Sequence, residues 1–399
     1  MNKSQKKRSL ILYFSTFIYM GMASAILGPS FLKLVEQTNS TLTDLSILFP
    51  LRSGAYLIGS WLAGMLYDRS NGNKLLTGSL IVMGVTLGLV PIFTEPTSLI
   101  LTFMVLALAM SLIDVGGNTL LFRIQASNLG PAMNALHFFY GLGSFVAPLI
   151  LAGSLHYQGG IHWGYWGLAL MSLPVLGQLI NLPAPENPDN NPKQSDEQRR
   201  EAVSKKTVLI PVIALFFFSF VGVELGFGDW ISTFSLRIGL ADQRAAIILT
   251  SVYWGAFTVG RLISIPLAAR LKPRQLVLGD LVGAIIGLGL VLIFPKDRTA
   301  VWVGTMILGF SLASMFPAML TLTEGLMPMT GKITSLFLIS GSLGAMFVPW
   351  LIGRNVEVTG PIVIIWVLFS ILTLGGIMFF ILSRLSKKPP QDNPRGDKS

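Results

Sequence analysis

The feature that most constrains this chain is a series of apolar stretches, each about as long as a membrane is thick. Twelve of them follow one another along the 399 residues, separated by short polar or charged segments. A helix of about 20 apolar residues crosses the hydrocarbon core of a bilayer. Because backbone polar groups must be satisfied inside that core, helices are the expected form of each stretch. The pattern predicts an all-α membrane protein with 12 transmembrane helices.

The composition supports this prediction and excludes a water-soluble domain. Hydrophobic residues make up 52% of the chain and charged residues only 12%, whereas soluble domains have about 25% charged residues. The net charge is +10, and most Lys and Arg lie at the N-terminus, in alternate loops and in the C-terminal tail. This distribution indicates membrane topology and argues against a nucleic-acid partner. It predicts a multi-pass protein of the plasma (inner) membrane with cytoplasmic N- and C-termini.

The apolar stretches divide into two sets of six. We predict spans near 9–35, 43–67, 73–93, 97–123, 131–157 and 162–182, and then near 207–235, 244–269, 274–294, 299–325, 331–354 and 359–384. The segment between the sets is rich in proline, asparagine and charge, which is typical of a solvated linker. The predicted domains are therefore an N-terminal six-helix bundle (1–182), a cytoplasmic linker (183–206) and a C-terminal six-helix bundle with a short cytoplasmic tail (207–399).

The two sets also match each other at a constant offset of 201 residues. The matched pairs include Gly21 with Gly222, Gly59 with Gly260, Gly143 with Gly344, and Pro148 with Pro349. One ungapped register through several spans indicates a duplicated unit rather than shared composition. Two parallel six-span repeats related by an axis along the membrane normal are an arrangement found in secondary transporters.

Helix-breaking residues occur at matched positions of the first span in each repeat. Gly28 and Pro29 in span one correspond to Asp229 and Trp230 in span seven, just after Gly226 and Gly228. Paired interruptions of this kind point to a binding site or gate. The alternative is that the glycines serve close helix packing.

Ionisable residues lie near the middle of spans, where placing a charged side chain in the bilayer is energetically unfavourable. The cost is at least ~2.5 kcal/mol for each of Asp114 and Glu224. Asn118 follows Asp114 by four residues and so lies on the same helix face. Two interpretations compete. Either the acids face a central cavity, bind a polar substrate and hold a proton or Na⁺, or Arg52 and Arg261 neutralise them as structural pairs.

Three further side chains are weaker candidates for the same cavity. His137 lies in span five, close to the amide of Asn134. Trp230 could pack its ring against a sugar, although aromatic residues in spans more often form packing and interfacial belts.

The loop after span two carries a recognisable motif. It runs Gly64-Met-Leu-Tyr-Asp-Arg-Ser-Asn-Gly-Asn-Lys74 and resembles the signature G-x-L-x-D-R-x-G-R-R/K of the major facilitator superfamily. One extra residue precedes the second glycine, and Asn73 stands in place of an arginine. We predict a cytoplasmic gate formed by Asp68, Arg69, Arg123 and Glu324, with ordinary interfacial charge as the alternative.

Four stretches resemble one branch of that superfamily, the sodium-dependent glucose transporter-like proteins, with fucose permease more distant. They are Asp114–Leu121, Ala135–Ser144, Phe220–Ile231 and Tyr253–Arg261. The resemblance implies a major facilitator fold of two pseudo-symmetric six-helix bundles, with Asp114 and Glu224 in a sugar cavity. The chain departs from the branch at Asp229, where glycine is common.

These observations together predict a monomeric secondary transporter in the lipid bilayer that works by alternating access. We expect cation-coupled uptake of a sugar or similar small polar solute, with H⁺ or Na⁺ at Asp114 or Glu224. Substrate contacts are predicted from Asp114, Asn118, His137, Glu224 and Trp230. The alternatives are a proton-coupled exporter of drugs or lipid-like amphiphiles, and a receptor without transport.

No residue pattern indicates an enzyme. The chain has no phosphate-binding loop, three histidines and no cysteine, so catalytic residues, a metal and a cofactor other than the coupling ion are not expected.

Overall fold

The computed structural model describes residues 3–125, 129–158, 160–180, 182, 185, 209–327 and 331–385. Every regular element in these residues is a helix. The predicted linker, apart from residue 185, lies outside them.

The first half of the described chain supplies six spans. Its helices are α1 (Lys3–Ala25), α2 (Leu27–Gln37), α3 (Leu42–Leu45), α4 (Leu48–Arg69), α5 (Gly72–Leu89), α6 (Pro96–Gln125), α7 (Leu129–Gln158), α8 (His162–Met171) and α9 (Leu173–Leu179). Span one comprises α1 and α2, and span six comprises α8 and α9.

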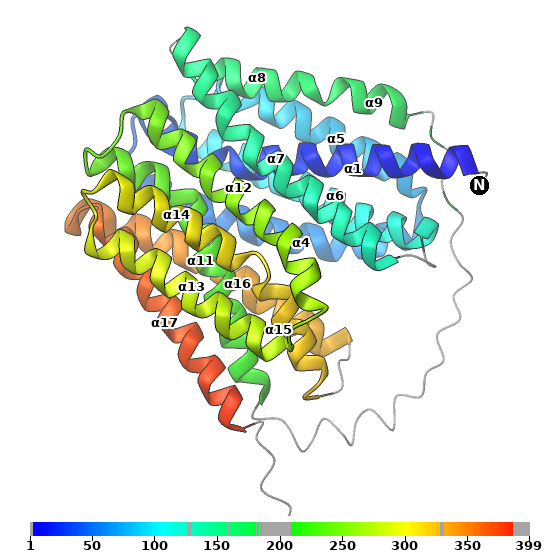
Figure 1. Cartoon of the computed structure of the whole chain (residues 1–399). Coiled ribbons are helices and arrows are strands. Elements are labelled where there is room, and N and C mark those ends of the chain that lie inside the picture. Colours follow the sequence, from blue (N-terminus) through cyan, green and yellow to red (C-terminus); the bar gives the residue numbers. More distant parts are fainter. Residues whose placement is uncertain are drawn as a thin grey trace, which may run out of the picture.

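The second half repeats this plan. Its helices are α11 (Leu209–Arg237), α12 (Gln243–Ala268), α13 (Pro273–Ile293), α14 (Arg298–Leu312), α15 (Met315–Glu324), α16 (Gly331–Thr359) and α17 (Ile362–Leu385). Figure 1 shows this half, green to red, beside the first half in blue to green. The described helices thus form the two sets of six spans that the sequence predicts.

The lengths of the helices fit a membrane. By length and composition, nine helices of the described residues could cross one, and the pair α1 and α2, bent by 46°, makes a tenth. The helix α4 and the broken pair α8 and α9 occupy the two remaining predicted spans.

One of the two predicted helix interruptions is wrong. Span one does break, between Ala25 and Leu27, close to Gly28 and Pro29. Span seven does not break, because α11 continues through Asp229 and Trp230 as one helix. Without a proline, the glycines of this segment remain helical, and they serve close packing instead.

The duplicated register has a structural basis in glycine packing. In the first half, a Cβ atom on Gly143 of α7 would collide with the backbone carbonyl oxygen of Ile18 on α1. In the second half, a Cβ atom on Gly344 of α16 would collide with the carbonyl oxygen of Phe218 on α11. Spans one and five therefore touch backbone to backbone, as do spans seven and eleven.

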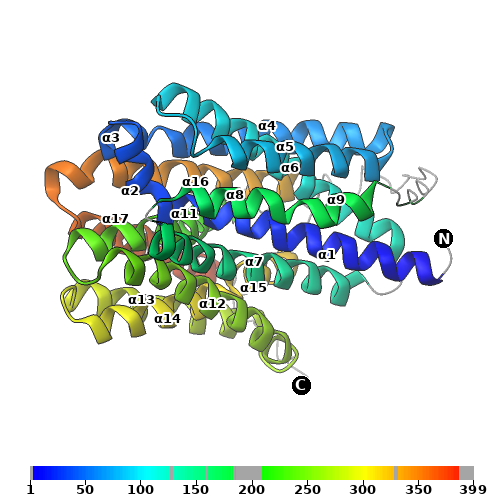
Figure 2. The ribbon, with the colours of Figure 1, turned by 90° about the horizontal axis from the view of Figure 1, so that it is seen from above.

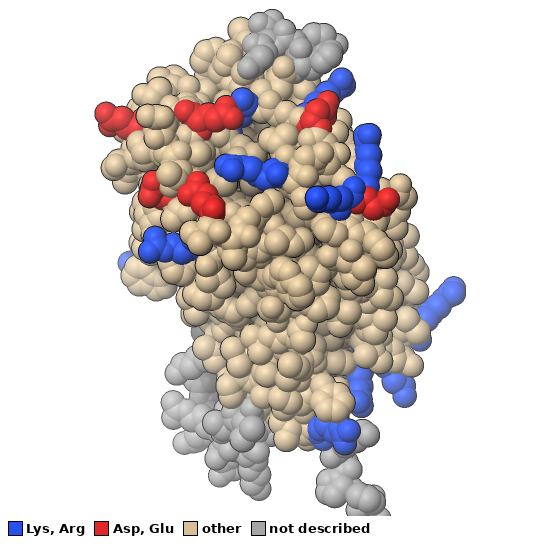
Figure 3. All heavy atoms as spheres, turned by 90° about the vertical axis from the view of Figure 1, so that its left-hand side faces the viewer, with Lys and Arg blue, Asp and Glu red and all other residues tan. Residues whose placement is uncertain are grey.

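The surface separates into zones of different polarity. Figure 3 shows charged side chains at the upper end of the molecule and basic ones at the lower end, with a broad uncharged belt between them. Large apolar side chains are exposed on several spans, among them Ile58, Val85, Val282 and Phe380. A soluble protein avoids such a surface, whereas a bilayer covers it.

Helices from the two halves meet along three lines. The helix α7 packs on α12, and α4 packs on α16. The short helix α2 packs on α11, and the short helix α3 packs on α16. Figure 2, which looks down on the view of Figure 1, places α2 and α3 at the end of the molecule opposite the N-terminus. We call this the outer end, and the end that carries the N-terminus the inner end.

Candidate functional site

Two cavities with polar residues in their walls lie between the halves. The central cavity, about 280 Å³, is lined by side chains of both halves, including Arg52, Tyr56 and Asp114 from the first. The inner cavity, about 560 Å³, is lined by Asn134 from the first half and by Glu224 and other residues from the second. Both cavities share His137, Val221, Arg261 and Ser342 in their walls. They are neighbouring compartments of one region between the bundles.

Asp114 lies in the wall of the central cavity, where its carboxylate is held from two sides. The Tyr56 hydroxyl donates to one carboxylate oxygen, Oδ2. Asn118 Nδ2 donates to the other, Oδ1, at 3.0 Å and also to the Asp114 carbonyl oxygen at 2.9 Å. The predicted shared face of Asp114 and Asn118 is thus present. Asn118 orients the acid, and its side chain is not among those that line either cavity.

Glu224 lies in the wall of the inner cavity, on α11. Arg261 of α12 lines the same cavity, and the two side chains do not form an ion pair within 4.0 Å. The Arg261 guanidinium also lies 4.6 Å from the centre of the Phe257 ring, a cation–π arrangement. Glu224 and Arg261 both belong to the second half and both line the inner cavity, so the acid faces the cavity with a guanidinium group in the same wall.

His137 lies at the junction of the two cavities, as one of the side chains that line both. Its ring meets the edge of Phe17 at 6.1 Å between centres. The amide Asn134 lies one turn before it on α7 and lines the inner cavity.

Trp230 occupies a different place from the other predicted substrate contacts. It is fully buried and is not among the side chains that line the two cavities. Its ring packs on Phe31 at 5.4 Å and on Phe49 at 5.8 Å, and both of these belong to the first half. Its indole Nε1 has no hydrogen-bond partner among the described residues. In this conformation the tryptophan belongs to an aromatic cluster between the halves.

Backbone contacts close the outer end beside this cluster. A Cβ atom on Gly28 of α2 would lie 2.6 Å from Asp229 Cα of α11. The Leu42 amide donates to Glu357 Oε1 at 2.8 Å, and Thr43 donates to the Gly353 carbonyl oxygen at 3.3 Å. The halves are therefore closed at the outer end.

The predicted gate loop is arranged within its own half. Arg123 donates to the Tyr67 carbonyl oxygen at 2.8 Å, next to Asp68 in the chain. Arg69 and Glu324 are exposed near the inner end. The structure places Arg123 beside the Asp68 segment, whereas Glu324 ends α15 in the second half. Whether these four residues act as a gate stays a prediction.

The motif's departure at Asn73 has a structural explanation. Asn73 is buried, accepts a hydrogen bond from Tyr13 at 2.9 Å and donates to the Leu182 carbonyl oxygen at 3.2 Å. It ties span one and the end of span six to α5, a role in which an arginine would place a charge in a buried site.

Sequence reasoning missed several polar groups of the central cavity. Tyr56 lies one helical turn after Arg52, a spacing that could have indicated it. Tyr140 donates to Ser24 at 2.8 Å, and both line this cavity. Hydroxyl groups are too common in spans to stand out, so no signal in the sequence identified Ser24.

Comparison with known proteins agrees with the fold. Residues 12–349 match the Major Facilitator Superfamily. Sodium-dependent glucose transporter 1A of Mus musculus is 29% identical over 374 residues, covering 85% of this chain and 88% of that protein. Sodium-dependent glucose transporter 1 of Xenopus laevis is 29% identical, with 92% and 79% covered. Major facilitator superfamily domain-containing protein 4A of Danio rerio is 27% identical, with 92% and 84% covered.

Solved structures share the fold at low identity. The nucleoside transporter NupG superposes with a TM-score of 0.72 at 16% identity, covering 98% of this chain and 100% of that one. A bacterial homologue of the human lysosomal transporter Spinster, in an inward-facing and unoccupied conformation, gives 0.73 at 14%, with 98% and 100% covered.

Proposed function

Because this chain belongs to the Major Facilitator Superfamily and is a multi-pass membrane transporter, we propose that it takes up a sugar, or a similar small polar solute, together with H⁺ or Na⁺. The observation that carries the proposal is the Asp114 carboxylate in the wall of a cavity between the halves, oriented by Tyr56 and Asn118. Carboxylates, hydroxyls and guanidinium groups are the partners that a polyhydroxylated solute needs.

The lining of the central cavity supports a polar cargo. Ser24, Tyr140 and His137 add hydroxyl and imidazole groups to Asp114 and Arg52. Polar groups buried at this depth reject a molecule that leaves them unpaired, which gives selectivity. Relatives named as glucose transporters support the same substrate class.

The position of the contacts between the halves supports alternating access. With the outer end closed by α2 and α3, the two cavities belong to the part of the protein that opens inward. Uptake requires the reverse closure, in which α2 leaves α11 and the inner ends of the halves approach. We place the inner end in the cytoplasm, as the distribution of Lys and Arg predicts.

Coupling is assigned to the two acids that face the cavities. Glu224 and Arg261 attract each other while the acid is charged. A proton or Na⁺ on Glu224 weakens that attraction and frees Arg261, which also lines the central cavity, to interact with cargo beside Asp114. Cargo and cation thereby favour each other's binding.

The test is uptake of a panel of labelled sugars into proteoliposomes that contain the Glu224→Gln variant. We expect gradient-driven accumulation to be lost while exchange of sugar across the membrane continues, because the amide keeps the shape of the acid and cannot hold the cation. Proton and sodium gradients applied separately identify the coupling ion.

Asp280→Asn is the matched control. Asp280 lies within span nine, accepts a hydrogen bond from Ser314 at 2.7 Å and lines neither cavity, so its replacement should preserve accumulation. Unchanged accumulation by Glu224→Gln would remove this acid from the coupling mechanism. Export of hydrophobic cations without sugar uptake would replace the proposal by the alternative of a drug or amphiphile exporter.

A further inference from the structure

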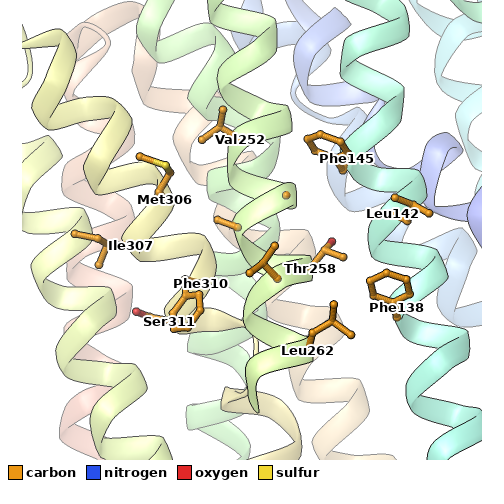
Figure 4. Close-up of a pocket in the computed structure, with 13 residues that line it drawn as sticks. Phe138, Leu142, Phe145, Val252, Thr258, Leu262, Met306, Ile307, Phe310 and Ser311 are labelled. Atoms are coloured by element: carbon orange, nitrogen blue, oxygen red, sulfur yellow. The ribbon is translucent and has the colours of Figure 1, made fainter. Parts of the chain in front are cut away.

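A third hollow, larger than either cavity, lies on the side of the molecule between the halves. It has a volume of about 820 Å³ and is formed by α7 of the first half and by α12 and α14 of the second. Figure 4 shows Phe138, Leu142 and Phe145 on one wall, facing Met306, Ile307 and Phe310 on the other. We call it the lateral groove.

The lateral groove lies at the depth of the membrane interior. Leu142 is near the middle of α7, and Ala256 is near the middle of α12. Large apolar side chains of the groove are open to the surroundings, since Val259 is 50% exposed, Met306 43% and Phe310 41%. In a membrane-spanning chain, side chains exposed at this depth face hydrocarbon.

The chemistry of the walls excludes water as a stable occupant. Among the described residues that line the groove, Thr258 and Ser311 are the only ones with polar side chains. The Thr258 hydroxyl is already donated to the Trp254 carbonyl oxygen at 2.8 Å. A stable buried water needs two to four polar partners, and such partners are too few here.

From its depth, its apolar walls and its opening to the bilayer, we propose that the lateral groove binds one acyl chain of a membrane phospholipid. A flexible alkyl chain fills an elongated apolar hollow of this size without leaving a polar group unpaired.

The bound chain touches both halves. On the floor of the groove, α7 and α12 are in direct contact: a Cβ atom on Gly255 would lie 2.9 Å from the Phe145 ring, and one on Gly141 would lie 2.5 Å from Thr258 Oγ1. Movement of one half against the other changes the distance between the walls. An acyl chain that fits this separation therefore stabilises the conformation with a closed outer end.

The groove also adjoins the transport pathway. Phe138 and Leu262 line both the lateral groove and the inner cavity. These two side chains stand between lipid and the solute compartment.

The chain has no cysteine, so single labelling sites can test the proposal. Val259→Cys places a fluorophore in the groove. Val282→Cys places one on α13 with matched exposure, 49% against 50%. The labelled proteins are reconstituted in phosphatidylcholine with brominated chains, which quench nearby fluorophores, and are then extracted into detergent. We expect quenching at both sites in the bilayer and, after extraction, retained quenching at Val259→Cys only.

A second substitution distinguishes a bound chain from general lipid contact. Val252→Phe puts a ring into the groove and should abolish the retained quenching, whereas Ile286→Phe, on the lipid-facing side of α13, should leave it intact. Melting temperature and elution volume confirm that both variants fold. If fluorescence recovers equally at the two labelled sites after extraction into detergent, the proposal is overturned. Absence of quenching at Val259→Cys in the bilayer also overturns it and indicates that a second protein copy covers the groove.

Discussion

At the scale of single residues, the central cavity depends on how one carboxylate is held. Asp114 accepts hydrogen bonds from Tyr56 on α4 and from Asn118 one turn along its own helix. Two donors on fixed helices leave the acid little freedom to turn away from the cavity. Such preorganisation lowers the cost of binding a polar solute.

Replacing Tyr56 by phenylalanine tests this arrangement. Loss of a hydrogen bond to a charged group costs about 1.5–3 kcal/mol, so kcat/KM for uptake should fall roughly ten- to a hundredfold. The control is Tyr165→Phe, which removes another buried hydroxyl, bonded to Ser30 at 2.8 Å and outside both cavities. Similar kinetic losses in the two variants would mean that Tyr56 acts only on stability.

The identity of several residues could be predicted from the sequence, and their neighbours could not. A helical turn places Asn118 beside Asp114, so that pair follows from spacing alone. Trp230 looked like a substrate contact because it follows an acid in an apolar span. Its partners Phe31 and Phe49 come from the other half, and no local pattern indicates contacts across that distance in the chain.

At the scale of helices, glycine decides which spans lie closest. Gly143 brings α7 onto α1, and Gly344, at the matched position, brings α16 onto α11. The lengths and order of the spans follow from hydropathy, but the continuity of α11 does not. In the sequence, Gly226 and Gly228 indicate a break. In the structure, the side chains of Leu368 and Trp254 from neighbouring helices pack against them.

Gly143→Ala should destabilise the first half. The added methyl group meets backbone atoms that cannot move aside, at a cost of about 1–3 kcal/mol. Gly153→Ala, on the same helix with open space around it, should be neutral or stabilising by up to about 1 kcal/mol. Thermal unfolding in detergent measures both. Equal melting temperatures for the two variants would contradict backbone packing at Gly143.

At the scale of the whole molecule, the halves meet at the outer end through small residues and backbone groups. Gly28 lies against the backbone of Asp229, and Ser46 lies under Gly353. These contacts leave no room for an added side chain. Closure of this end is therefore sensitive to single atoms far from the cavities.

Gly28→Ala should shift the conformational equilibrium towards an open outer end. A methyl group 2.6 Å from Asp229 Cα penalises the closed state by about 1–3 kcal/mol, a population change of roughly five- to a hundredfold. A Ser46→Cys reporter, buried in the closed state, should react faster with a membrane-impermeant maleimide in this background. Gly78→Ala, where no atom is near, should leave the labelling rate unchanged. Slower or equal labelling in the Gly28→Ala background would contradict the assignment of this contact to the closed state.

The duplicated halves contain two kinds of position, those that match at the constant offset and those that do not. The packing glycines recur at an offset of 201 residues, but the cavity acids do not: the counterpart of Asp114 is Met315, and that of Glu224 is Ala23. The two halves therefore share the glycines that set helix packing, whereas each half contributes a different acid to the cavities. A hybrid gene encoding two copies of either half would keep the glycine contacts within each bundle and lose one of the two acids. We therefore expect neither hybrid to carry out the coupled transport proposed above.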